Sequence, residues 1–190
     1  MVISNLNIAT IIHKTPTRIL EIQKLTNVIQ TTSIQTNKEK YFKLCESGCV
    51  NFGSKYSCPP YSPSFKNFSS KFTSLKVICY KIALDQYSEA TPYNRVRASN
   101  SVLKSLLDKE LLNCKLNELL VVGSGSCRAC KPCAAKEKLK CKKPEKLIFS
   151  LESLGVDVNQ LVTDCFGFQL EWYKKGFPQQ FTSVVGGVLS

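Results

Sequence analysis

The chain has 190 residues and a formal net charge of +12, with 26 lysines and arginines against 14 aspartates and glutamates. That length suits one domain with its own hydrophobic core. No apolar run approaches the ~20 residues of a membrane span, and residues 1–10 lack a charged leader followed by an apolar block. The sequence therefore excludes a secreted or membrane-inserted protein and favours a soluble, cytoplasmic one.

The first predicted element is a helix that begins near Thr15 and Pro16, where proline suits the first helical turn. Apolar residues then recur at helical spacing, which predicts one face docked on the core. These residues are Ile19, Ile22, Leu25 and Ile29.

Residues 43–63 are rich in cysteine, glycine, serine and proline and predict an ordered loop, the first cysteine loop. Its cysteines are Cys45, Cys49 and Cys58, and Pro59 and Pro60 follow directly. Three thiolates can bind three irons of an iron-sulfur cluster. The fourth iron would then be bound by a distant residue, by a substrate or by nothing. A zinc ion or structural staple completed by another cysteine is an equal alternative, and the candidates for that ligand are Cys79, Cys114 and Cys165.

Residues 75–84 predict a strand, with Cys79 as a small buried residue. Apolar residues at helical spacing predict a long helix over residues 93–113, and residues 118–122 predict a second strand. The order strand, helix, strand favours an α/β fold, with α+β as the alternative. We expect a single small domain over residues 1–190, with a central sheet, flanking helices and cysteine-rich metal-binding loops.

A second cysteine loop, residues 123–144, follows directly after that strand. Its candidate ligands are Cys127, Cys130, Cys133 and Cys141. The first three have the spacing of ferredoxin-type ligands, whereas the fourth lies further downstream than in those proteins. Structural zinc sites more often pair two separate Cys-x2-Cys units. The pattern predicts a 4Fe-4S cluster, with zinc as the alternative.

Six lysines surround the fourth candidate ligand and form what we call the lysine segment: Lys136, Lys138, Lys140, Lys142, Lys143 and Lys146. Such a segment can offset the negative charge of a cluster or dock an acidic redox protein. Nucleic acid is a weaker alternative, because no aromatic residues are interleaved with these lysines to stack on bases.

Towards the C-terminal side, residues 150–154 predict one helical turn that stops at Gly155, and Asp157 predicts the cap of a short helix through Cys165. Residues 181–189 are apolar and favour a strand that returns to the sheet. The single histidine, His13, has no ligand spacing, so a catalytic triad is excluded and no catalytic residue is assigned.

The cysteines and their neighbours resemble an uncharacterised family of predicted metal-binding proteins found largely in anaerobic microbes. The resemblance rests on Cys45, Cys49 and residues 56–60, on residues 125–133 with Cys141 and Pro144, and on residues 150–158. It implies metal binding through these cysteines and supplies no reaction.

The preferred hypothesis is an iron-sulfur protein that transfers electrons or acts as a redox accessory in anaerobic metabolism. A zinc-stabilised module that binds nucleic acid or protein is one alternative. An enzyme that uses an open cluster iron on a sulfur or one-carbon substrate is another.

Overall fold

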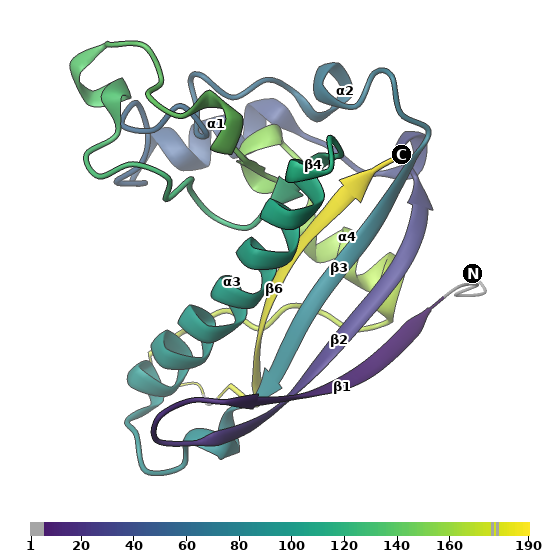
Figure 1. Ribbon diagram of the computed structural model, residues 1–190, viewed down its shortest axis with the longest axis vertical. Helices are drawn as coiled ribbons and strands as arrows, with labels where there is room; N and C mark the ends of the chain where they lie inside the picture. Colours follow the sequence, from purple (N-terminus) through teal and green to yellow (C-terminus); the bar gives the residue numbers. More distant parts are fainter. Residues whose placement is uncertain (1–5, 176, 178) are drawn as a thin grey trace.

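The computed structural model describes residues 6–175, 177 and 179–190, and its centre is a six-stranded mixed sheet (Figure 1). The strand order is β1-β2-β3-β6-β4-β5, and every neighbouring pair is antiparallel except β4 and β5. The strands are β1 (Asn7–Lys14), β2 (Ile19–Gln30), β3 (Ser74–Ala83), β4 (Leu120–Gly123), β5 (Phe149–Ser150) and β6 (Phe181–Leu189). A single domain with a central sheet is what the sequence predicts.

The predicted N-terminal helix is wrong, because its residues form strand β2, paired with β1 on one side and β3 on the other. Along β2, Leu20 and Ile22 are buried on one face of the sheet, and Leu25 and Asn27 are buried on the opposite face. A strand covered on both faces does not show a simple two-residue alternation. Its apolar positions therefore matched a helical period by coincidence.

Two helices cover opposite faces of the sheet and create two apolar cores (Figure 1). Helix α3 (Pro92–Leu116) inserts Leu103, Leu107 and Leu111 into one core. Helix α4 (Val158–Phe166), capped by Asp157, packs on the other face. The predicted long helix, the predicted cap and the predicted strands at residues 75–84, 118–122 and 181–189 are confirmed, with boundary shifts of up to three residues.

The remaining helices are short and lie near the loops. Helix α1 (Lys38–Glu46) and helix α2 (Phe65–Phe68) flank the first cysteine loop. The short 3-10 helices are η1 (Thr31–Ser33), η2 (Leu84–Tyr87), η3 (Ala134–Glu137), η4 (Pro144–Lys146) and η5 (Glu152–Leu154). The predicted loop over residues 43–63 therefore needs one correction, since residues 43–46 form the last turn of α1.

The turn η5 ends at Gly155, as predicted, and its backbone lies directly under α1. A Cβ on Gly155 would lie 2.7 Å from the Cα of Lys38, so only glycine permits this contact. Among the described residues, no helix combines the length and the apolar character needed to cross a membrane.

Candidate metal centre

The first cysteine group consists of Cys45, Cys49 and Cys58. Cys45 lies in the last turn of α1. This helix begins after Asn37, whose side chain accepts a hydrogen bond from the Lys40 amide. The Cys49 amide donates to the Cys45 carbonyl at 2.9 Å, so the chain turns directly from the helix to the second thiol. Cys45 is half-buried, Cys49 is exposed and Cys58 is buried.

The thiols of this group influence one another. Burial raises the pKa of Cys45, and the negative charge of the Cys49 thiolate raises it further. Burial also raises the pKa of Cys58, a hydrogen bond with Ser57 opposes that rise, and the charges of Cys49 and Cys45 add to it. The fold therefore brings these three thiols into one electrostatic neighbourhood, in which a cation or a metal would favour the thiolate forms.

A half-buried lysine stands beside this group. The Lys38 ammonium donates to the Ser62 carbonyl at 3.0 Å, to Ser62 Oγ at 2.9 Å and to the Ser153 carbonyl at 2.6 Å. Burial lowers the pKa of Lys38, and the neighbouring Cys45 thiolate opposes that shift. Lys38 thus fixes α1 to η5 and to the end of the first cysteine loop, and it places a positive charge close to a candidate ligand.

The second cysteine group consists of Cys127, Cys130, Cys133 and Cys141, all of them half-buried. Ala134 and Ala135 anchor the middle of this loop, because η3 buries both side chains. A second half-buried lysine, Lys115 near the end of α3, donates to the Leu147 carbonyl. Burial lowers the pKa of Lys115, whereas the charges of Cys127, Glu145 and Cys141 raise it, which places Cys127 and Cys141 near one ammonium group.

Two direct hydrogen bonds join the two cysteine loops. The Cys127 amide donates to Ser57 Oγ at 2.9 Å, and the Tyr56 hydroxyl donates to the Leu139 carbonyl at 2.5 Å. Ser57 is completely buried and also lies 3.7 Å from the sulfur of Cys58. One side chain therefore contacts a candidate ligand in each group, and both loops lie at the same end of the sheet (Figure 1).

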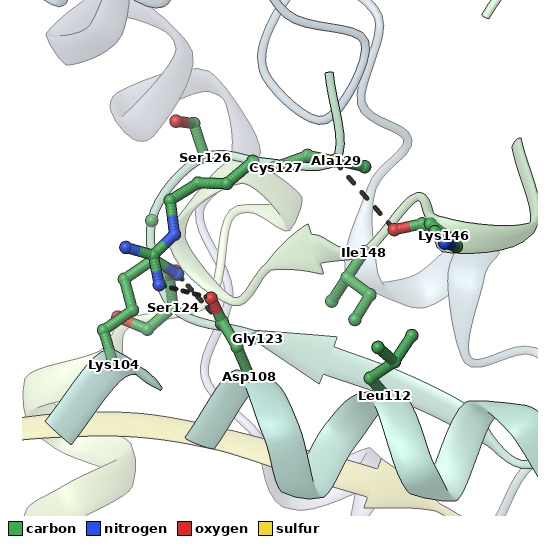
Figure 2. A pocket seen from close by; sticks show the side chains of 12 residues that line it. Lys104, Asp108, Leu112, Gly123, Ser124, Ser126, Cys127, Ala129, Lys146 and Ile148 are labelled. Atoms are coloured by element: carbon green, nitrogen blue, oxygen red, sulfur yellow. Dashed lines mark hydrogen bonds and ion pairs between the residues drawn. The ribbon is translucent and has the colours of Figure 1, made fainter. Parts of the chain in front are cut away.

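The start of the second loop rests on α3 around a cavity of about 160 Å³ (Figure 2). Asp108 of α3 links the two elements, because its carboxylate lies 2.6 Å from the Arg128 guanidinium of the loop; it also lies 3.1 Å from the ammonium of Lys104 on the same helix. Leu112 and Ile148 line the apolar side of the cavity. The Lys104 ammonium also donates to the Ser124 carbonyl, so the second cysteine loop is tied to α3 on both sides of Cys127, through Ser124 and Arg128.

The other cysteines lie elsewhere. Cys79 and Cys165 are buried in the core on the α4 face, and burial raises the pKa of each thiol to about 12. Cys114 packs against the core on the α3 face. The expectation that Cys79 is a core residue is confirmed, and the same placement disfavours Cys79 and Cys165 as a fourth ligand of the first group.

Among the residues that the structure describes, no three His, Cys, Asp or Glu side chains lie close enough to hold one metal ion. The ligand role of the seven cysteines therefore remains a prediction. The donor set itself, thiols in two groups with an ammonium beside each, suits a thiolate-bound metal with a net negative charge.

The sequence did not single out Lys38, Lys115 or Ser57 as part of this centre. Lysines are common on the exposed surface of a basic chain, so sequence alone gives these two no distinction. Ser57 had one signal, its position directly before Cys58 and the prolines.

A scan against protein-family models matches residues 27–189 to the family described as predicted metal-binding protein (DUF2284). Searches of the curated proteins and of the solved structures found no significant match. The matched span contains all ten cysteines and every strand except β1 and the start of β2. The chain therefore belongs to this family of predicted metal-binding proteins.

Proposed function

We propose that the protein is an iron-sulfur protein that transfers electrons or serves as a redox accessory. The observation that supports this most is that Ser57 contacts a cysteine of each group, so that the two groups adjoin at one end of the sheet. A half-buried lysine also lies beside each group. A purely structural staple would not need two adjoining thiol groups, each with its own ammonium.

The spacing of the second group favours a 4Fe-4S cluster bound by Cys127, Cys130, Cys133 and Cys141. Such a cluster supplies reversible one-electron transfer when it is bound. With four thiolates it carries about two net negative charges in its oxidised form. Lys115 would neutralise part of that charge, which favours retention of the cluster and raises its reduction potential.

The first group would hold a second metal through Cys45, Cys49 and Cys58. Lys38 would stabilise the thiolate form of Cys45, and Ser57 would donate a hydrogen bond to the Cys58 sulfur. Because the sulfurs do not converge on one point in this structure, metal binding would have to draw the loops together. Soft thiolates and small loop residues make that closure feasible.

The lysine segment supports an acidic redox protein as the partner. All six of its lysines are exposed, and they flank Cys141 in the sequence. A positive surface beside a redox site attracts an acidic electron carrier and aligns it before transfer. We therefore expect the partner interaction to weaken as ionic strength rises.

The first prediction tests the metal. Protein purified without oxygen should be brown, with a broad visible absorption that bleaches on reduction and with equal amounts of iron and acid-labile sulfide. Thiolate-bound iron absorbs visible light, whereas closed-shell zinc does not. Stoichiometric zinc without sulfide would instead establish a zinc-stabilised module.

The matched variants are Cys130→Ser and Cys79→Ser, which change one candidate ligand and one core thiol. Cys130→Ser should lose about half or more of the iron, because three thiolates hold a cluster poorly. Cys79→Ser should keep its iron even though it is less stable. Equal iron loss in both variants would contradict the division between ligands and core thiols.

A further inference from the structure

Glu152 places a carboxyl group in an unusual position. Its Oε2 atom is buried and has no hydrogen-bond partner among the described protein atoms. Burial raises the pKa of this carboxyl, while hydrogen bonds from its own amide and from Ser150, together with the charge of Lys104, oppose the shift. Leaving such a group without a partner costs free energy, so a partner such as water, an ion or a ligand is expected there.

Two cavities meet at Glu152. The smaller, of about 100 Å³, is lined by Asn100, Ser124, Glu152 and Trp172, among others. The larger, of about 370 Å³, lies between α1 and the start of α4 and is lined by Tyr41, Glu152, Asp157 and Trp172. Glu152 and Trp172 therefore belong to both cavities, and together the cavities have room for a small organic molecule.

The larger cavity has more acidic than basic side chains, in contrast to the chain as a whole. It is lined by two carboxyl groups, Glu152 and Asp157, and by one ammonium group, that of Lys40. The chain as a whole carries +12. The Lys40 ammonium lies 5.4 Å from the centre of the Tyr41 ring, so it is directed towards that ring. A cation bound here would favour the ionised form of Glu152 against the effect of burial, on a protein that repels cations overall.

The aromatic lining narrows the type of cation. Trp172 supplies an aromatic ring that attracts an organic ammonium, and a primary ammonium brings three N–H donors for the carboxyl oxygens. A hard metal ion would need six or more oxygen ligands. Among the described residues around these cavities, no three His, Cys, Asp or Glu side chains lie close enough to hold one metal ion.

We propose that Glu152 and the two cavities that it lines bind a small organic molecule through its primary ammonium group. Glu152 accepts a hydrogen bond from the ammonium, Asp157 contributes a second carboxylate, and Trp172 and Tyr41 pack on the attached carbon atoms. This site does not depend on metal binding, because none of the seven candidate ligands lines either cavity.

Trp172 is the only tryptophan of the chain, so its fluorescence reports directly on this site. The full chain is titrated with ethylammonium chloride in an amine-free buffer, with sodium chloride at equal ionic strength as the reference. We expect a saturable fluorescence change that only ethylammonium produces. Tetramethylammonium chloride should bind more weakly, because that cation has no N–H donor for the carboxyl groups.

Glu152→Gln should weaken ethylammonium binding about tenfold or more, since it removes a charge-assisted hydrogen bond. Glu39→Gln is the matched control, because Glu39 lies exposed on α1 outside the cavity, and it should bind as the wild type does. Asp157→Asn provides a second test, since asparagine still caps α4 but lacks the charge. It should weaken binding several-fold.

The proposal is overturned if the wild-type signal follows ionic strength alone, or if both Glu152→Gln and Asp157→Asn bind ethylammonium normally. It is also overturned if magnesium chloride saturates the same signal at lower concentration, since the site would then be a metal site. Circular dichroism of each variant verifies that the fold is retained. Calorimetric titration gives the same comparison where a bound cluster quenches the tryptophan.

Discussion

At the scale of single residues, the carboxyl group of Glu152 links stability to pH. Its pKa is raised in the folded state, mainly by burial. Above the pKa of the unfolded chain, about 4.5, the unfolded state releases this proton while the folded state still holds it. The contribution of Glu152 to stability therefore falls as pH rises from about 4.5 through its raised folded-state pKa.

We predict that Glu152→Gln is more stable than the wild type near pH 7 and nearly equal to it at pH 4. Glutamine keeps the shape of the side chain and removes the cost of ionising a buried group. Urea unfolding midpoints measured in steps from pH 4 to pH 8 would reveal the divergence. Glu39→Gln should follow the wild type, and parallel curves for all three proteins would show that Glu152 is not buried in solution.

Single residues also mark the limit of what the sequence could predict about the site. The cysteine spacings were sufficient to identify the candidate ligands, because thiol chemistry is visible in a motif. Lys38, Lys115 and Glu152 depend on burial, and burial arises only when α1, α3 and η5 meet. No local pattern distinguishes these three from the exposed lysines and glutamates of the same chain.

At the scale of elements, the prediction was correct for helix α3 and for strands β3, β4 and β6, and it failed for strands β1 and β2. Helix α3 shows one apolar stripe, so its period was clear. Strand β2 buries Leu20 and Ile22 on one face and Leu25 on the other, so the periodic signal was misleading. Strand β1 was not expected, since it is an edge strand with many exposed side chains and gains order by pairing with β2.

We expect the contact between α3 and the second cysteine loop to determine how fast the protein loses a bound metal to a chelator. Asp108 carries that contact through its ion pair with Arg128. We predict that Asp108→Asn releases its metal to a chelator several-fold faster than the wild type, because Arg128 no longer holds the loop next to Cys127. Global stability should fall by no more than about 1 kcal/mol, since the ion pair is partly exposed.

The measurement is the rate of bleaching in excess chelator, together with a urea unfolding curve. Glu89→Gln is the control, because Glu89 also forms an exposed ion pair, with Arg18, but lies outside both cysteine loops. A chelation rate for Asp108→Asn equal to that of Glu89→Gln would mean that the loop is held by other contacts.

At the scale of the whole molecule, β6 holds the two parts of the sheet together. It pairs with β3 on one side and with β4 on the other. A Cβ on Gly186 would lie 2.7 Å from the Val122 carbonyl oxygen and 3.1 Å from the Leu111 side chain. The junction between β6, β4 and α3 therefore has no room for a side chain at this position.

We predict that Gly186→Ala destabilises the fold by about 2 kcal/mol, because the added methyl group must displace backbone in a packed sheet. The loss should be visible in urea unfolding and should be accompanied by faster proteolysis within residues 124–147, which extend from β4. Gly48→Ala is the control, since a Cβ there meets no atom of the described residues within 4 Å. Equal stabilities of the two variants would show that β4 shifts freely.

The position of β6 also determines when this scaffold can exist during synthesis. All seven candidate ligands precede β6 in the chain, yet β4 joins β3 only through it. A chain emerging from the ribosome therefore displays these thiols before the framework that arranges them can close. Metal delivered at that stage would encounter a flexible polythiol, whereas metal delivered after residue 189 has been made would encounter two arranged groups. The strand order thus favours metal insertion after translation of β6 over insertion into the nascent chain.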